Sequence, residues 1–270
     1  MGQYYRMCNL KKNWKLSNQP VAMTLCPYEF NNGAKLMEFS YVGNGLMMAM
    51  EWLIANKFNG MPFVCVGDYA DAKITPKYNK MIVRNYWGDE LPKKCEYIEI
   101  VKAALGDKYD EFIKNGRSGI EIPYDEVAFK ALENIDGIGV DGSLDVYTCA
   151  SDLEDKKSCN SVYQRTKALI PKYEDIPYYK YAVNLTKKEY VIIPTFKPNK
   201  WVIHPLSLLC ADGNGRGGGD YREMHDKNEN LIPNDYDLVG HWAYDRIYIT
   251  NDRTKVKGYK KITPHFKERF

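Results

Sequence analysis

Residues 62–71 read PFVCVGDYAD, and this stretch indicates a short buried strand that ends in a polar turn. The strand is expected over Phe63–Val66, because a short apolar run bounded by glycine is typical of a fully buried strand. Gly67 ends the run, and Asp68 and Asp71 follow it. Acids that follow a buried strand are common at active sites in α/β sheets, and they are also common as caps and turns. We therefore take Asp68 and Asp71 as candidate ligand-binding residues.

A second part of the chain repeats this pattern. IYITNDRT, at residues 247–254, resembles FVCVGDYAD in being an apolar strand that ends at an acid. YYRMCNLKK, at residues 4–12, resembles YYKYAVNLTKK at residues 178–188 in the same way. Two related lobes would explain this internal similarity. Chance resemblance between tyrosine-rich strands explains it as well, so both explanations stay open.

Strand patterns lie at both ends of the chain, at residues 3–10, 21–30, 63–66, 178–194 and 247–249. A helix is expected over residues 45–60, because Leu46, Met50 and Leu53 recur at helical spacing. Residues 94–116 and 123–135 also predict helices, so the block from 88 to about 170 differs in character from both ends.

These patterns predict an α+β fold, with a mixed or mainly antiparallel sheet formed by the N- and C-terminal thirds and a central helical insertion. The expected boundaries are an N-terminal lobe over residues 1–87, the insertion over 88–177 and a C-terminal lobe over 178–270. The two outer lobes are expected to pack as one domain.

Composition excludes several classes of protein. The chain has 270 residues with 44% hydrophobic and 27% charged residues, so wholesale disorder is not expected. Its net charge is +3 and its basic residues are spread along the chain, which does not support nucleic-acid binding. No two of its seven cysteines form a C-x-x-C pair. No apolar run is long enough for a membrane span, and we expect a cytoplasmic protein with reduced thiols. The 22 tyrosines favour a binding surface or a tyrosine-rich sheet.

The stretch CADGNGRGGGDYREM, at residues 210–224, contains five glycines between Gly213 and Gly219. A dinucleotide-binding loop is one interpretation, since Gly213, Gly215 and Gly218 fit G-x-G-x-x-G. No helical pattern follows the loop, however, and that fingerprint requires one. A second interpretation is an anion- or partner-binding loop. Its candidate residues are Gly213, Gly215, Arg216, Gly217, Gly218 and Gly219. A mobile connection without a ligand is the third.

The same stretch partly fits a calcium loop. The candidate metal ligands are Asp212, Asn214, Asp220 and Glu223. They follow the order of oxygen ligands in an EF-hand, but Arg216 occupies a ligand position and no clear helices flank the loop. No cofactor is certain, and a divalent cation is the one ligand that this spacing suggests.

All four histidines lie in the C-terminal part of the chain, near the Gly-rich stretch. His204, His241 and Asp245 are therefore candidate catalytic residues, and Cys210 with His204 is a conceivable nucleophile pair. No G-x-S-x-G, H-E-x-x-H or Walker pattern accompanies them. Lone histidines are more often hydrogen-bonded structural residues than catalytic ones.

Several stretches together resemble a family of uncharacterised proteins of bacteria and their viruses. These stretches are MGQYY, KLMEFSYVGN, VGDYAD, VNLTKKEYV, IHPLSLLCADGNGRGGGDY and VGHWAYDRI, in this order. The resemblance covers the first 71 residues and roughly residues 178 to 250, and it leaves out the helical middle. It implies a prokaryotic or phage setting and no particular activity.

Two function classes follow. The first is a binding protein that engages a protein or a nucleotide-like ligand through its tyrosine-rich surface and Gly-rich loop, for example a phage-borne inhibitor of host machinery. The second is a metal-assisted hydrolase or transferase acting on a phosphorylated or nucleotide substrate. The absence of a standard catalytic motif favours the first class, and the histidines and aspartates around one loop favour the second.

Overall fold

The computed structural model describes residues 2–17, 19–70, 80–93, 95–141, 145–152, 161–213 and 219–267. The chain forms two compact units. The main unit comprises Met1–Lys12, Val21–Ala72 and Tyr147–Phe270, and the inserted unit comprises Asn13–Pro20 and Lys73–Val146.

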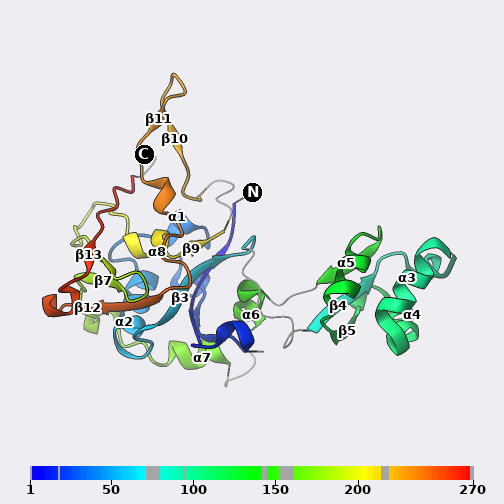
Figure 1. The fold of residues 1–270 in the computed structure, drawn as a ribbon. Coiled ribbons are helices and arrows are strands. Elements are labelled where there is room, and N and C mark those ends of the chain that lie inside the picture. Colours follow the sequence, from blue (N-terminus) through cyan, green and yellow to red (C-terminus); the bar gives the residue numbers. More distant parts are fainter. Residues whose placement is uncertain are drawn as a thin grey trace. The chain divides into compact units, whose positions relative to one another are not determined.

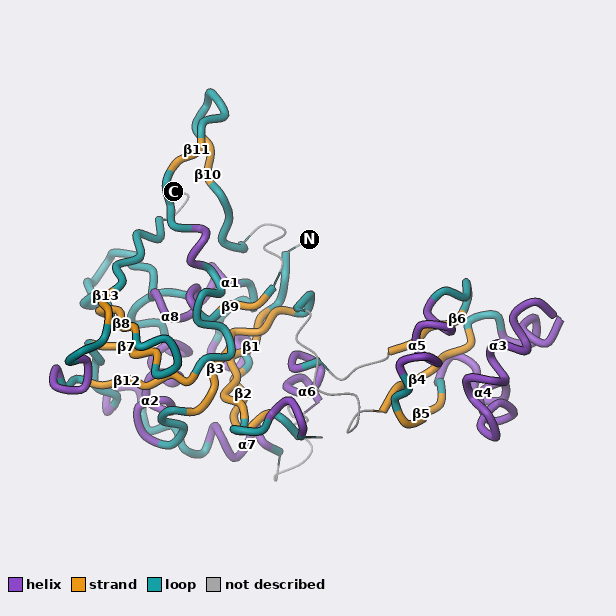
Figure 2. Tube along the Cα trace, in the orientation of Figure 1, coloured by secondary structure: helices purple, strands orange, loops and turns teal. Residues whose placement is uncertain are grey.

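A mixed sheet is the centre of the main unit (Figures 1 and 2). Its strands are β1 (Tyr5–Leu10), β2 (Val21–Leu25), β3 (Met61–Gly67), β7 (Tyr181–Asn184), β8 (Glu189–Ile192), β9 (Ala211–Asp212), β12 (Arg246–Thr250) and β13 (Lys260–Lys261). They lie in the order β13-β8-β7-β12-β3-β1-β2, and β9 also pairs with β3. The β13–β8 and β3–β9 pairs are parallel, and the other pairs are antiparallel. The predicted α+β class, with a sheet built from both ends of the chain, is confirmed.

This sheet contains an internal repeat. In its first half, β1 pairs with β3 as Arg6–Val66, Met7–Cys65, Cys8–Val64 and Asn9–Phe63. In its second half, β7 pairs with β12 as Tyr181–Thr250, Ala182–Ile249, Val183–Tyr248 and Asn184–Ile247. The similar stretches of sequence therefore pair in the same register. Pro62 and Arg246, which directly precede Phe63 and Ile247, pair with each other, so a local two-fold axis passes between them. This geometry favours related halves as the explanation of the sequence similarity.

The helices of the main unit are α1 (Leu36–Phe39), α2 (Gly45–Asn56), α6 (Val146–Asp152), α7 (Val162–Lys167) and α8 (Pro205–Leu209). The predicted helix at 45–60 is α2, which begins where the Asn44 side chain accepts a hydrogen bond from the Leu46 amide. Its fully buried apolar residues, which belong to the main core, are Leu46, Met47, Ala49, Met50, Leu53 and Ile54. The helix α2 of the first half packs on β12 of the second half. The helix α8 of the second half packs on β3 of the first half.

The inserted unit contains three strands as well as the predicted helices. They are β4 (Lys80–Asn85), β5 (Ile120–Pro123) and β6 (Ile138–Asp141), in the antiparallel order β5-β4-β6. The helices α3 (Cys95–Leu105), α4 (Tyr109–Asn115) and α5 (Glu126–Glu133) complete it. Met81, Val83 and Leu132 are fully buried in its own core. The unit ends at Val146, earlier than the expected boundary at residue 177, because α6 and α7 belong almost entirely to the main unit.

The remaining elements are short. The strands β10 (Met224–His225) and β11 (Leu231–Ile232) form a hairpin. Single 3-10 turns lie at Trp14–Leu16, Pro27–Phe30, Gly88–Lys93, Gly106–Lys108, Gly116–Ser118, Tyr173–Asp175, Tyr236–Leu238 and Arg253–Val256. In the described ranges, no helix combines the length and the hydropathy of a membrane span.

Candidate functional site

The Gly-rich loop begins at the same edge of the sheet at which β3 ends. Val66 of β3 pairs in parallel with Asp212 of β9, so Asp68 and Gly213 follow their strands side by side. The Asp68 turn and the start of the loop are therefore neighbours in the structure. Asn214, Gly215, Arg216, Gly217 and Gly218 of the loop, and Asp71 of the turn, lie outside the described residues.

Close packing favours glycine at the start of the loop, because a larger residue would displace the ends of two neighbouring side chains. A Cβ atom at Gly213 would lie 2.2 Å from Gln3 Oε1 and 2.7 Å from the Tyr5 hydroxyl oxygen. At the other end of the loop, Gly219 has a φ of +85°, a conformation that favours glycine, and its carbonyl accepts a 2.7 Å hydrogen bond from the Met37 amide. Both ends of the loop are thus fixed to the main unit, and these two glycines have structural roles.

Three candidate aspartates surround the base of the loop, and each has a hydrogen bond. Asp68 Oδ1 accepts from the Tyr4 amide at 3.1 Å, Asp220 Oδ2 accepts from the Gln3 amide at 3.3 Å, and Asp212 accepts from the Tyr244 hydroxyl. Burial raises the pKa of Asp220 to about 6, against the Gln3 hydrogen bond and the charges of Arg222 and Lys35. Asp220 is therefore partly protonated near neutral pH.

The described carboxylates do not form the oxygen shell of a calcium loop. No group of three or more His, Cys, Asp or Glu side chains suitable for a metal ion occurs among the described residues. Asp212 is bonded to Tyr244, Asp220 lies buried against Gln3, and Glu223 Oε2 is 3.9 Å from His225 Nε2 on the β10–β11 hairpin. The three described candidate ligands, Asp212, Asp220 and Glu223, therefore have separate partners and do not point toward one common site.

His204 is a buried structural residue. Its Nδ1 accepts a 3.2 Å hydrogen bond from the Leu206 amide, so the proton must be on Nε2, which donates to Glu51. Both side chains are buried, and they join α2 of the first half of the sheet to α8 of the second. Because both ring nitrogens of His204 are engaged, it is not placed to activate Cys210. Burial also raises the pKa of the Cys210 thiol, which disfavours the thiolate.

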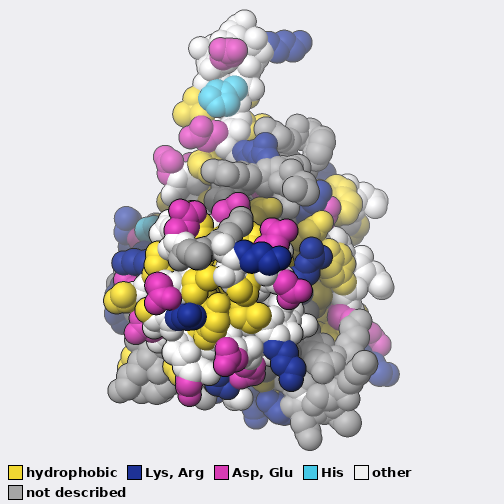
Figure 3. Space-filling view, turned by 90° about the vertical axis from the view of Figure 1, so that its right-hand side faces the viewer, with side chains coloured by type: hydrophobic (Ala, Val, Ile, Leu, Met, Phe, Trp, Pro, Cys, Tyr) yellow, Lys and Arg dark blue, Asp and Glu magenta, His cyan; other side chains and the backbone are white. Residues whose placement is uncertain are grey.

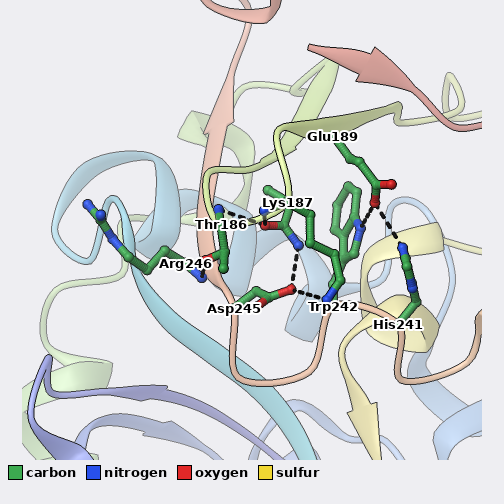
Figure 4. Close-up of polar contacts among 8 residues, drawn as sticks. Thr186, Lys187, Glu189, His241, Trp242, Asp245 and Arg246 are labelled. Atoms are coloured by element: carbon green, nitrogen blue, oxygen red, sulfur yellow. Dashed lines mark hydrogen bonds and ion pairs between the residues drawn. The ribbon is translucent and has the colours of Figure 1, made fainter.

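His241 and Asp245 lie in a polar cluster beside β7 and β8 (Figure 4). Glu189 Oε2 is 2.9 Å from both His241 Nε2 and Trp242 Nε1. Burial raises the pKa of Glu189, but hydrogen bonds from Trp242 and His241 outweigh this effect and lower it overall. Asp245 Oδ2 accepts from Asn184 at 2.8 Å and lies 3.1 Å from Lys187 Nζ.

The carboxylates in this cluster are therefore occupied by partners that hold β7, β8 and β12 together. Among the candidate catalytic residues, His241 keeps a third of its side chain exposed, whereas Asp245 is 13% exposed and His204 is fully buried. A catalytic role for His241 would have to use its Nδ1, because its Nε2 contacts Glu189.

An aromatic pocket, which the sequence interpretation missed, opens on the main unit. It is a cavity of about 400 Å³. Its lining includes Tyr41, Asn44, Phe196, Lys197, Asn199, Lys200 and Trp201. The Tyr41 and Trp201 rings meet edge to face with centroids 4.8 Å apart, and the Phe196 ring stacks on Tyr178 at 5.7 Å. The Trp201 side chain is 72% exposed, which is unusual for so large an apolar group.

Backbone pairing between distant segments builds this pocket. Tyr41 forms an isolated antiparallel bridge with Ile203, and the Val42 amide donates to the Val202 carbonyl at 2.9 Å. These contacts bring FKPNKW, residues 196–201, against the turn that precedes α2. The alternation of aromatic residues and lysines in FKPNKW was the signal in the sequence, but its partner Tyr41 is far away along the chain.

The inserted unit also exposes apolar side chains. The face turned to the viewer in Figure 3 carries hydrophobic side chains at its centre with charged side chains around them. In this unit Val127 is 79% exposed and Ile100 is 41% exposed.

Comparisons with family models, curated proteins and solved structures find no match to this chain. The assignment of a function therefore depends on the geometry of the chain itself.

Proposed function

We propose that this chain is a binding protein that engages a protein or a nucleotide-like ligand through the aromatic pocket, with the base of the Gly-rich loop as a second contact region. The observation that carries the proposal is the exposure of Trp201 and Phe196 around one cavity. Exposed aromatic side chains that line a hollow are typical of recognition sites, because their burial on binding releases water from a large apolar area.

The candidate catalytic residues support binding over catalysis. Both nitrogens of His204 are engaged, and Asp245 is bonded to Asn184 and Lys187. A general base needs a free lone pair within reach of its substrate. The metal-assisted hydrolase or transferase remains the second candidate, and it would depend on His241 and the aspartates near the loop.

The resemblance to bacterial and phage proteins suggests a setting for such a binding protein. An inhibitor of host machinery carried by a phage or a mobile element would need recognition surfaces and no catalytic centre. This setting makes components of a bacterial host the natural source of partners.

The test is affinity purification of the whole chain from a bacterial host, followed by mass spectrometry of the captured proteins and small molecules. Trp201→Ala is expected to lose the specific partner. Tyr28→Ala is the control, because Tyr28 is 56% exposed and does not line the pocket. Equal capture by the wild-type chain and Trp201→Ala would contradict the proposal. Turnover of a phosphorylated substrate in the presence of magnesium or calcium would favour the enzyme instead.

A further inference from the structure

We infer that the aromatic pocket binds a free nucleotide, with the base against Trp201 and Tyr41 and the phosphate near Lys197 and Lys200. This inference rests on the proposed function and names the chemical class of its ligand. Its volume of about 400 Å³ lies within the range of roughly 300–1,000 Å³ that is usual for small-molecule sites.

The aromatic part of the lining is suited to a planar ring. Trp201 presents most of its indole to solvent, and Tyr41 supports it from the side by an edge-to-face contact at an interplanar angle of 75°. This support restricts the movement of an otherwise exposed side chain. A nucleobase stacks on such a face with little dependence on its sequence identity, because every base has a π-face.

The charged part of the lining is suited to an anion. Lys197 and Lys200 line the pocket, and no Asp or Glu lines it. Within the described part of the chain neither lysine forms an ion pair with a carboxylate. Two ammonium groups that form no ion pair attract a phosphate, and this attraction is strongest at low salt.

Asn199 adds hydrogen-bonding capacity at the same place. Its φ of +62° places it in a tight turn between the two lysines, and its side chain has no hydrogen bond to another described residue. An amide offers both a donor and an acceptor, as the edges of the bases require. Asn44, in contrast, is occupied by Leu46 and Asn32.

A second cavity of the main unit has a lining that is less suited to a nucleotide. It has a volume of about 240 Å³, and its lining includes Ile192, Pro194, Pro205, Ile262 and Pro264 with Lys261 as its one charged residue. The aromatic residue in its lining, Phe266, is partly buried and packs edge to face against Tyr221, whereas Trp201 is 72% exposed. A nucleotide is therefore expected to select the aromatic pocket over this cavity.

A single strand of nucleic acid is a less suitable occupant. Proteins that bind single strands without sequence preference use a groove of positive charge that follows several nucleotides. Here the lining contains two lysines, Lys197 and Lys200, beside one pair of aromatic rings, Tyr41 and Trp201. The chemistry of one base and one phosphate fits this pocket better than a continuous backbone does.

The experiment is calorimetric titration of the full chain with AMP, UMP and GMP at low salt, with adenosine, inorganic phosphate and a ten-nucleotide oligo-dT as separate arms. A nucleotide is expected to bind more tightly than either its nucleoside or phosphate alone. Trp201→Ala is expected to weaken nucleotide binding roughly tenfold or more, as for the loss of one stacked base. Lys197→Gln and Lys200→Gln should each weaken it roughly threefold, with no effect on adenosine.

Matched controls keep the result interpretable. Lys227→Gln removes an exposed lysine of the β10–β11 hairpin, and Tyr28→Ala removes an exposed ring outside the pocket; both should bind like the wild-type chain. Trp201 is so exposed that its replacement should leave the melting temperature unchanged. Failure of all three nucleotides to bind at millimolar concentration, or binding that Trp201→Ala does not weaken, would overturn the inference.

The same measurements separate this inference from the proposed function. If oligo-dT binds and mononucleotides do not, the ligand is a nucleic-acid strand and the inference is wrong. If no nucleotide binds but a captured protein depends on Trp201, the proposed function stands and the inference fails. If no ligand or partner depends on Trp201, both fail.

Discussion

The two halves of the large sheet, β1-β2-β3 and β7-β8-β12, share one register but carry different polar side chains. Asn9 and Asn184 occupy equivalent positions, and their neighbours on the next strands are Met23 and Glu189. Met23 of the first half is apolar, whereas Glu189 of the second half accepts hydrogen bonds from His241 and Trp242. The shared backbone register is thus compatible with different side chains in the two halves.

The largest effect is expected where the halves are joined through their helices. His204→Ala removes the partner of buried Glu51 and should lower the free energy of unfolding by about 3–5 kcal/mol, because it strands a carboxylate in the core. Adding Glu51→Leu should recover much of this loss. Guanidinium unfolding of the single and double variants measures both values. A loss below about 1 kcal/mol for His204→Ala would show that the pair does not link the halves.

A smaller effect should distinguish the two equivalent asparagines. Asn184 donates to Asp245 at 2.8 Å and accepts from the amides of Thr186 and Lys187, whereas the Asn9 side chain donates one 3.3 Å bond to the Pro62 carbonyl. Asn184→Ala should therefore cost about 2–3 kcal/mol and Asn9→Ala about 1 kcal/mol. Urea unfolding of the two variants provides the comparison. Equal losses would mean that the divergence of the halves has no energetic consequence.

The pH dependence should have opposite signs at two aspartates of the main unit, Asp220 and Asp252. The folded pKa of Asp220 is about 6, above the ordinary value of 3.8. Its contribution to stability is therefore present below about pH 4 and is lost as the pH rises through 6. Asp220→Asn should remove this loss and raise the free energy of unfolding at pH 7 by on the order of 2 kcal/mol.

Asp252 is the control for this sign. Hydrogen bonds from Thr254 lower its pKa, so its contribution is present above its ordinary pKa and is lost as the pH falls. Asp252→Ala should therefore destabilise the chain at pH 7 and have less effect at pH 3. Unfolding curves at both pH values, taken as differences from the wild-type chain, test the pair. Parallel pH profiles for the two variants would contradict the assigned pKa shifts.

The smallest effect is expected from removing residues 73–146, which lie between the halves in the chain and form a core of their own. With a flexible linker in their place, the two halves should still pair and unfold cooperatively. The midpoint in urea should change little, while the slope should fall because less surface is exposed on unfolding. A gradual transition without cooperativity would show that the sheet needs the inserted unit.

The outer sheet could be predicted from the sequence because its strands are marked by strong local patterns. PFVCVG is an unbroken apolar run, and residues 45–56 have a clear helical period. The three strands of the inserted unit, β4, β5 and β6, were not predicted; β5 and β6 have only four residues each, and β6, with the sequence IGVD, looks like a turn. Their pairing with β4 depends on contacts that no local pattern contains.

The candidate site was predictable only in part. Asp68 was a candidate because it follows a predicted strand, and Gly213 and Asp220 were candidates because they lie in the Gly-rich stretch. The structure brings all three to one edge of the sheet. The role of Gly213 depends on Gln3, whose position only the fold reveals. The aromatic pocket joins Tyr41 to Trp201 through the Ile203 bridge, so neither residue alone could indicate it.

Pro62 and Arg246 pair with each other across the local two-fold axis of the sheet. In a dimer of identical halves, these two positions would carry the same type of residue. The Arg246 amide donates to Thr186 Oγ1 at 3.0 Å. The equivalent residue in the first half is Lys11, which has no hydroxyl, and Pro62 has no amide proton to satisfy. The first half thus lacks both the amide donor and the hydroxyl acceptor of this hydrogen bond, and the second half has both. A homodimer could not carry such a matched asymmetry, whereas halves joined in one chain can change on each side of the axis separately.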